Sequence, residues 1–252
     1  MDRKHIKSKA KDSLKRNYKY GVLISLLICS FTVLYFLLEF PFTIRLNPLR
    51  AIQREQVNII VSLSMFVLSL FVFNPIAVYC KNWYVKHGEF NIKDVFQKDK
   101  YFKILKITII QFIRLFISIL PVAIVFGILY SYTVTLFTSK QIGILTILVM
   151  MLLFTLGIGI YRWIKLIIKW SQTPYIIFSD QQYDAEKTIK FSESMMKEHE
   201  WEYFVLQLSF IGWSLFGIIT LGIVKIFWKD PYLLETNAEY FKMLRKISRA
   251  IK

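Results

Sequence analysis

The fold class is decided by one uncharged stretch, Ile142-Gly-Ile-Leu-Thr-Ile-Leu-Val-Met-Met-Leu-Leu-Phe-Thr-Leu-Gly-Ile-Gly-Ile-Tyr161, whose only ionisable group is the terminal phenol. A helix rises about 1.5 Å per residue, so this stretch is roughly 30 Å long as a helix. That length matches the hydrocarbon core of a bilayer. The stretch therefore predicts a membrane-spanning helix.

The whole chain is too apolar for a soluble domain of its size. Its 252 residues are 55% hydrophobic and its mean hydropathy is +0.45, so much of its surface must face lipid. The 33 Lys and Arg against 17 Asp and Glu give a formal charge of +16. Such an excess usually lies on the cytoplasmic side, against anionic headgroups. We therefore expect membrane lipids as partners, and favour them over nucleic acid.

The remaining apolar runs predict an all-α, polytopic membrane helix bundle. A single transmembrane domain over residues 20–252 follows a basic surface helix or arm over residues 1–19. Proline cannot continue the hydrogen-bond ladder of a helix, so the Asn74-Pro75 pair predicts a kink in the second span. Full spans are expected at about 20–38, 57–80, 104–130 and 142–168.

The last apolar region, residues 204–228, is long for one span and short for two. A single crossing would place the basic tail, residues 229–252, outside the cell, against the positive-inside tendency. We favour a hairpin of two short helices, about 204–216 and 219–230, turning near Gly217 and Gly222. It makes six membrane helices with both termini cytoplasmic in the cell membrane; the alternative is five spans. Lipid cannot satisfy the backbone of such a turn, so protein must shield it.

The basic N-terminal segment carries a thin apolar stripe, because Ile6, Ala10 and Leu14 recur every four residues. It predicts a surface helix that binds anionic lipid, and the alternative is a solvated basic arm. Cys29 and Cys80 lie in or beside apolar runs at different depths, which predicts packed thiols and no disulfide.

Ionisable residues within the spans are the candidate functional groups, because a charge in hydrocarbon needs a partner or a route to water. Arg114 lies in the third span, and Glu202, at the cytoplasmic mouth of the hairpin, is its candidate partner. Alternatively, Arg114 extends to the headgroups without a fixed partner. Lys225 lines a polar cavity with Thr220 or extends to the surface. Glu39, at the outer end of the first span, is expected to be interfacial.

No motif for catalysis or cofactor binding is present. His5, His87 and His199 occupy separate segments without a second ligand at helical spacing, so no metal site is expected. The chain also lacks a Gly-x-Ser-x-Gly elbow, a phosphate-binding glycine loop and a His-Glu-x-x-His pair. We therefore expect no cofactor, no catalytic residue and no enzymatic activity.

Two parts of the chain resemble the bacterial membrane family catalogued as domain of unknown function 975. The first is the opening Ile6-Lys-Ser-Lys-Ala-Lys-Asp-Ser-Leu-Lys15 with Asn17-Tyr18. The second comprises Ser192-Glu-Ser-Met-Met-Lys197, Trp201, Phe204-Val-Leu-Gln-Leu-Ser-Phe-Ile-Gly-Trp213, Leu221-Gly-Ile223, Pro231-Tyr232, Thr236, Ala238 and Tyr240. The resemblance implies a polytopic α-helical membrane protein and no known activity. The chain departs from the family pattern at Glu198, where relatives usually have glycine, and at Lys225 and Lys229-Asp230, which are usually apolar.

Together these features predict a non-enzymatic protein of the cytoplasmic membrane. It would act on lipid, on partner membrane proteins or on membrane-active peptides, in an accessory or self-protection role. The alternative is a small transporter or export component with a polar intramembrane path along Arg114 and Lys225.

Overall fold

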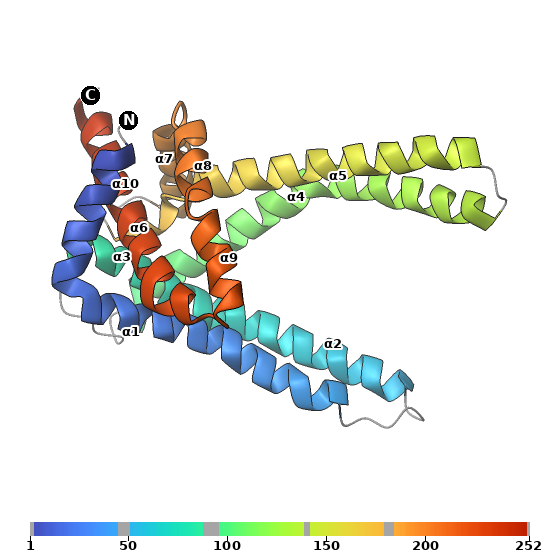
Figure 1. Cartoon of the computed structure of the whole chain (residues 1–252), viewed down its shortest axis with the longest axis horizontal. Helices are drawn as coiled ribbons and strands as arrows, with labels where there is room; N and C mark the ends of the chain where they lie inside the picture. Colours follow the sequence, from blue (N-terminus) through green and yellow to red (C-terminus); the bar gives the residue numbers. More distant parts are fainter. Residues whose placement is uncertain (1–2, 45–50, 88–95, 139–141, 179–183, 251–252) are drawn as a thin grey trace.

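The computed structural model describes residues 3–44, 51–87, 96–138, 142–178 and 184–250, with side chains for 3–30, 33, 60–87, 96–135, 144, 146–178 and 184–248. Every element in these ranges is helical, as the sequence predicts (Figure 1). In chain order they are α1 (Arg3–Ile44), α2 (Ala51–Leu68), η2 (Ser69–Phe73), α3 (Asn74–Lys86), α4 (Lys98–Thr138), α5 (Ile142–Trp170), α6 (Thr173–Ile177), α7 (Ala185–Met196), α8 (Glu200–Leu208), α9 (Ile211–Ile219), η4 (Lys225–Lys229) and α10 (Asp230–Ala250).

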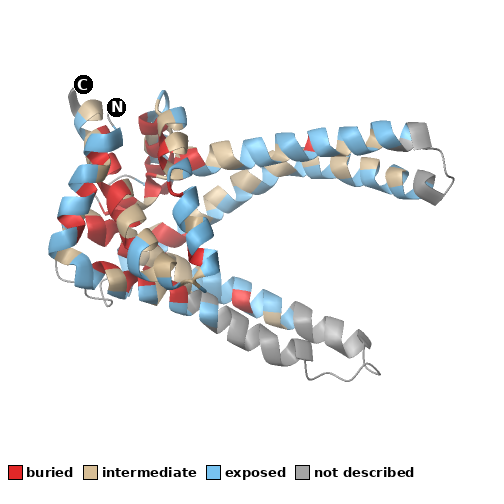
Figure 2. Ribbon diagram, viewed as in Figure 1, coloured by how far each residue is buried: buried red, intermediate tan, exposed pale blue. Residues whose placement is uncertain are grey.

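Two long antiparallel hairpins project from a helical base (Figure 1). The outer parts of α1 and α2 form the first arm, and those of α4 and α5 form the second. Buried residues gather in the base, whereas the described part of the second arm is largely exposed (Figure 2). Its exposed side chains are large and apolar, as Phe154 and Met150 show, and contiguous apolar surface of this extent needs a lipid or protein partner.

Four described segments are long and apolar enough to cross a membrane, so the chain is a multi-pass membrane protein. They are Ile60–Lys86, Lys98–Thr135, Thr146–Ile177 and Glu200–Ile219. The first three contain most or all of the expected second, third and fourth spans. The expected first span, residues 20–38, lies in α1, and most of the side chains in its outer half are outside the described residues.

The chain has a π-helical turn, η2, directly before the Asn74-Pro75 pair at which a kink is predicted. Pro75 has no N–H to donate to the carbonyl of Phe71, four residues earlier. The hydroxyl of Tyr101, on α4, donates to that carbonyl instead, at 2.9 Å. A side chain from the second arm therefore stabilises the break in the first.

The same arrangement recurs at the other end of the chain. The π-helical turn η4 is followed by Asp230-Pro231, and Pro231 leaves the carbonyl of Phe227 without its helical donor. The hydroxyl of Tyr18, on α1, donates to this carbonyl at 2.8 Å.

The chain reverses direction after α9, as the hairpin interpretation predicts (Figure 1). The reversal is at Leu221 and Gly222, which both have positive φ angles (49° and 89°), and α9 packs against η4. A Cβ added at Gly217 would lie 3.1 Å from the Cβ of Lys225, so glycine permits this close approach. The expected boundaries differ, because the first limb is two helices, α8 and α9, with a break at Ser209 and Phe210.

The base is built around α3, whose side chains are mostly buried. α10 packs against α3 and against α1. The apolar stripe of Ile6, Ala10 and Leu14 is buried in the protein, so the expectation that it binds lipid is corrected: the base covers the stripe, and most of the basic side chains beside it are exposed. Cys29 and Cys80 are free, buried thiols, as predicted.

An ion pair between Lys9 and Glu239 joins α1 to α10, and Lys242 of α10 contacts the same carboxylate. Lys9 Nζ lies 3.3 Å and Lys242 Nζ 2.7 Å from the carboxylate of Glu239. Burial alone would raise the pKa of Glu239, but the hydrogen bond from Lys242 and the charge of Lys9 hold it below its usual value. Glu239 is therefore a charged carboxylate that links the two terminal helices.

Candidate functional site

A pocket of about 250 Å³ lies where α5 meets α8, at the root of the second arm. We call it the α5–α8 pocket. Four lining residues come from the last turns of α5 and three from the first turns of α8, so the meeting of two helix ends creates it. They are Tyr161, Ile164, Lys165, Ile168, Glu200, Trp201 and Phe204.

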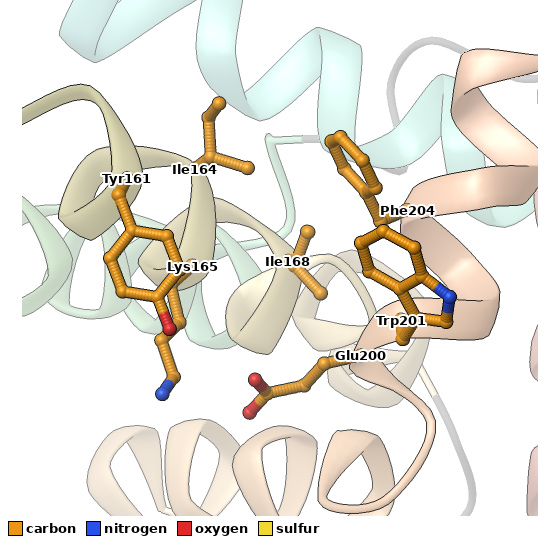
Figure 3. A pocket seen from close by; sticks show the side chains of 7 residues that line it. All are labelled: Tyr161, Ile164, Lys165, Ile168, Glu200, Trp201 and Phe204. Atoms are coloured by element: carbon orange, nitrogen blue, oxygen red, sulfur yellow. The ribbon is translucent and has the colours of Figure 1, made fainter. Parts of the chain in front are cut away.

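The pocket is amphipathic along its length. In Figure 3 the ammonium of Lys165 and the carboxylate of Glu200 lie at one end, with Ile164 and Phe204 toward the other. The rings of Trp201 and Phe204 are 5.4 Å apart. Trp201 is 72% exposed, and exposed tryptophan beside lysine is typical of the membrane interface.

The charged end of the pocket has a net positive charge. Lys169 Nζ lies 3.8 Å from the carboxylate of Glu200 and offsets it. Lys165 Nζ lies 5.7 Å from the ring centre of Tyr161, and among the described ion pairs it has no carboxylate partner. An anionic group on a ligand would find in Lys165 an ammonium that forms no ion pair with the carboxylates that the structure describes.

Arg114 has partners other than the predicted one. Its guanidinium lies 3.4 Å from Glu193 and 3.5 Å from Glu186, both on α7. Glu193 also accepts a hydrogen bond from Trp170 Nε1, at 2.8 Å. The structure thus places Glu186 and Glu193, and not the candidate Glu202, beside Arg114, because α7 packs against α4 and α5.

Glu202 lies at the start of α8, 3.1 Å from His199 Nδ1. It is two residues from the pocket-lining Glu200. Glu39 belongs to α1, but its side chain is outside the described residues.

The side chain of Lys225 is 44% exposed and reaches an acidic partner. Its ammonium lies 3.0 Å from Asp230 and 3.5 Å from the sulfur of Cys29. The hydroxyl of Thr220 donates to Phe216 O and accepts from the backbone N–H of Val224, so it closes the hairpin turn locally.

A polar cluster that sequence reasoning missed joins α1, α3 and α10. Ser13 Oγ and Glu235 Oε1 lie 3.2 and 3.1 Å from the same nitrogen, Nε2 of His87, and Asn17 Nδ2 lies 3.3 Å from Nδ1. In a serine–histidine–acid relay, the serine and the acid contact opposite ring nitrogens. The cluster therefore lacks that geometry, and ties three helices of the base together around a fully buried Glu235.

The α5–α8 pocket was also missed, because its two halves are about 35 residues apart in the sequence. One signal was present: Tyr161, Trp201 and Phe204 are aromatic residues at helix ends rich in charge.

Comparisons with known proteins identify the family and nothing beyond it. No curated protein and no solved structure matches the chain. The model of the family described as "Protein of unknown function (DUF975)" matches residues 1–248, so the chain belongs to this family.

Proposed function

We propose that this protein is a non-enzymatic protein of the cell membrane that binds anionic lipid at the α5–α8 pocket. The observation that carries the proposal is the amphipathic lining, with rings and isoleucines at one end and the unneutralised Lys165 at the other. Acyl chains suit the apolar end, and a headgroup phosphate suits the ammonium.

The positive charge of the pocket favours anionic lipid over a membrane-active peptide as its ligand. Membrane-active peptides are commonly rich in Lys and Arg, and Lys165 and Lys169 would repel them. Anionic lipid meets no such repulsion. An accessory or self-protection role would then act through the lipid around the protein, in preference to direct capture of a basic peptide.

Both termini are proposed to be cytoplasmic. They lie close together at one end of the base (Figure 1), and Lys9 of α1 pairs with Glu239 of α10. Seven basic side chains in the first 19 residues are exposed, at Arg3, Lys4, Lys9, Lys11, Lys15, Arg16 and Lys19. Their positive charge supports placing this end of the protein on the cytoplasmic side, where the lipid headgroups are anionic.

The alternative, a small transporter along Arg114 and Lys225, receives no support from their contacts. Arg114 is held by α7, whereas Lys225 is held by Asp230 and Cys29. The two cations therefore belong to separate ion pairs on different helices.

The test compares two exposed tryptophans. Trp201 lines the pocket, whereas Trp213, on α9, does not. Native mass spectrometry of the full chain in maltoside would measure retained phosphatidylglycerol, with phosphatidylcholine of the same acyl chains as the headgroup control. We expect Trp201→Ala and Lys165→Met to lower phosphatidylglycerol binding about tenfold, the effect of about 1.4 kcal/mol, and Trp213→Ala to leave it unchanged. Equal retention by all variants, or no preference for phosphatidylglycerol, would reject the proposal.

A further inference from the structure

Lys81 is a half-buried cation for which the described residues supply no counter-charge. It lies on α3, where most neighbouring side chains are buried, including Cys80, Asn82 and Tyr84. No described carboxylate lies within ion-pair distance of its ammonium. A charge removed from water without a counter-charge is costly, so a lysine kept in this place needs a compensating group.

The side chain of Lys81 lines a cavity of about 240 Å³, separate from the α5–α8 pocket, which we call the Lys81 cavity. The cavity lies where α3, α4, α6 and the end of α5 meet. No acidic residue belongs to its lining. Five polar residues share the lining with Lys81: Asn74, Thr108, Gln111, Ser171 and Thr173.

The hydrogen bonds around this cavity leave donors unused. Asn74 donates to Thr108, and Thr108 donates to Ile104 O. Gln111 Nε2 donates to Thr173 Oγ1 at 3.3 Å, so the hydroxyl hydrogen of Thr173 remains to be donated. The ammonium of Lys81 adds three more donors. A ligand that fills this space must supply acceptors and negative charge.

We propose that the Lys81 cavity binds an oxyanion, a phosphate or a carboxylate. Lys81 supplies the charge, and Thr173 supplies a neutral hydrogen bond. The remaining wall is apolar, with Val78, Ile104 and Ile107 among its residues, and suits an apolar body that carries the oxyanion. The same chemistry has two sources, a lipid headgroup or a free phosphate, and the two arms of the test separate them.

The experiment uses the full chain in maltoside micelles, titrated by calorimetry with two probes, inorganic phosphate and dihexanoyl phosphatidic acid. We expect saturable binding of at least one probe and a loss of at least tenfold in affinity with Lys81→Met. Lys86→Met is the matched control, because it removes an exposed charge from the same helix, and it should change the affinity less than twofold. Binding of phosphate alone assigns a free anion; binding of the short-chain lipid alone assigns a headgroup.

Two further variants keep the test decisive. Thr173→Val preserves the shape of the side chain and removes only the hydroxyl, and should lower the affinity severalfold even if Lys81→Met does not fold. Trp201→Ala should leave the binding of inorganic phosphate intact, and any short-chain lipid binding that this variant removes belongs to the α5–α8 pocket. The inference is overturned if the wild-type protein binds neither probe, or if Lys81→Met and Thr173→Val bind as tightly as the wild type.

Discussion

The hydroxyl of Tyr18 is expected to stabilise the fold by about 1 kcal/mol, because it donates to a carbonyl that Pro231, after η4, cannot reach with an N–H. Pro231 deprives the carbonyl of Phe227 of its helical donor, and the hydroxyl of Tyr18 takes that place at 2.8 Å. A net hydrogen bond contributes about 0.5–1.5 kcal/mol. Tyr18 is 39% exposed, so with partial solvation we expect Tyr18→Phe to lower the unfolding free energy by about 1 kcal/mol.

A double-mutant cycle isolates this interaction. Pro231→Ala restores an N–H that can donate to Phe227 O, and it keeps the Cβ that lies near Gly21. In that background Tyr18→Phe should cost less than about 0.3 kcal/mol, which gives a coupling energy of at least about 0.7 kcal/mol. Reversible unfolding in mixed detergent–SDS micelles, followed by circular dichroism, measures all four proteins.

The parallel site repeats the experiment within the same molecule. Tyr101→Phe and Pro75→Ala should show coupling of the same sign, because Tyr101 donates to Phe71 O. Tyr132→Phe is the control, since this exposed tyrosine on α4 has no hydrogen bond through its hydroxyl among the described contacts. If Tyr18→Phe lowers the unfolding free energy equally in the proline and alanine backgrounds, the stabilisation by the hydroxyl does not depend on the N–H that Pro231 lacks.

Three other predictions concern the base and the hairpin. Glu198 has a φ of 78°, so Glu198→Gly should raise the unfolding free energy by about 1 kcal/mol by relieving left-handed strain. Glu198→Ala retains a Cβ and removes the charge, and an equal gain there would attribute the effect to charge. In a double-mutant cycle, Arg114→Gln and Glu193→Gln should be coupled by up to about 1 kcal/mol in unfolding free energy, as for a partly exposed ion pair. The control cycle combines Arg114→Gln with Glu202→Gln. Coupling in the control cycle alone would make Glu202 the partner of Arg114. A single cysteine at Leu221, in a background without the native cysteines, should react poorly with impermeant thiol reagents added from outside. A reporter fused after the last residue should be cytoplasmic. An external C-terminus would leave five spans.

The membrane character and the helix reversal could be predicted from the sequence because both depend on local properties. An uncharged run such as residues 142–161 fixes the span by its length and composition. The irregularity at Asn74-Pro75 follows from the missing N–H of one residue. The reversal follows from Gly217 and Gly222 within an apolar run that is too short for two full crossings.

The partners of the charged residues could not be predicted in the same way. Arg114 meets Glu186 and Glu193 because α7, a short surface helix, packs across α4 and α5. That packing depends on contacts between distant segments, which periodicity does not reveal. The stripe of Ile6 and Ala10 shows the same difficulty. An apolar helix face predicts burial, but the sequence does not tell whether lipid or another helix, here α10, covers that face.

The charged residues that depart from the family pattern near the hairpin compensate one another, and the π-helical turn makes this possible. In an α-helix, neighbours on one face are three or four residues apart, so Lys225 and Asp230, five apart, would point in different directions. A π-helical turn bonds residues five apart, and here the N–H of Asp230 donates to the carbonyl of Lys225. Their side chains meet at 3.0 Å, and Lys229 lies 3.9 Å from the same carboxylate. Because Pro231 follows directly, one backbone irregularity places two cations and one anion together. The net charge that this limb of the hairpin adds is thereby reduced from two to one.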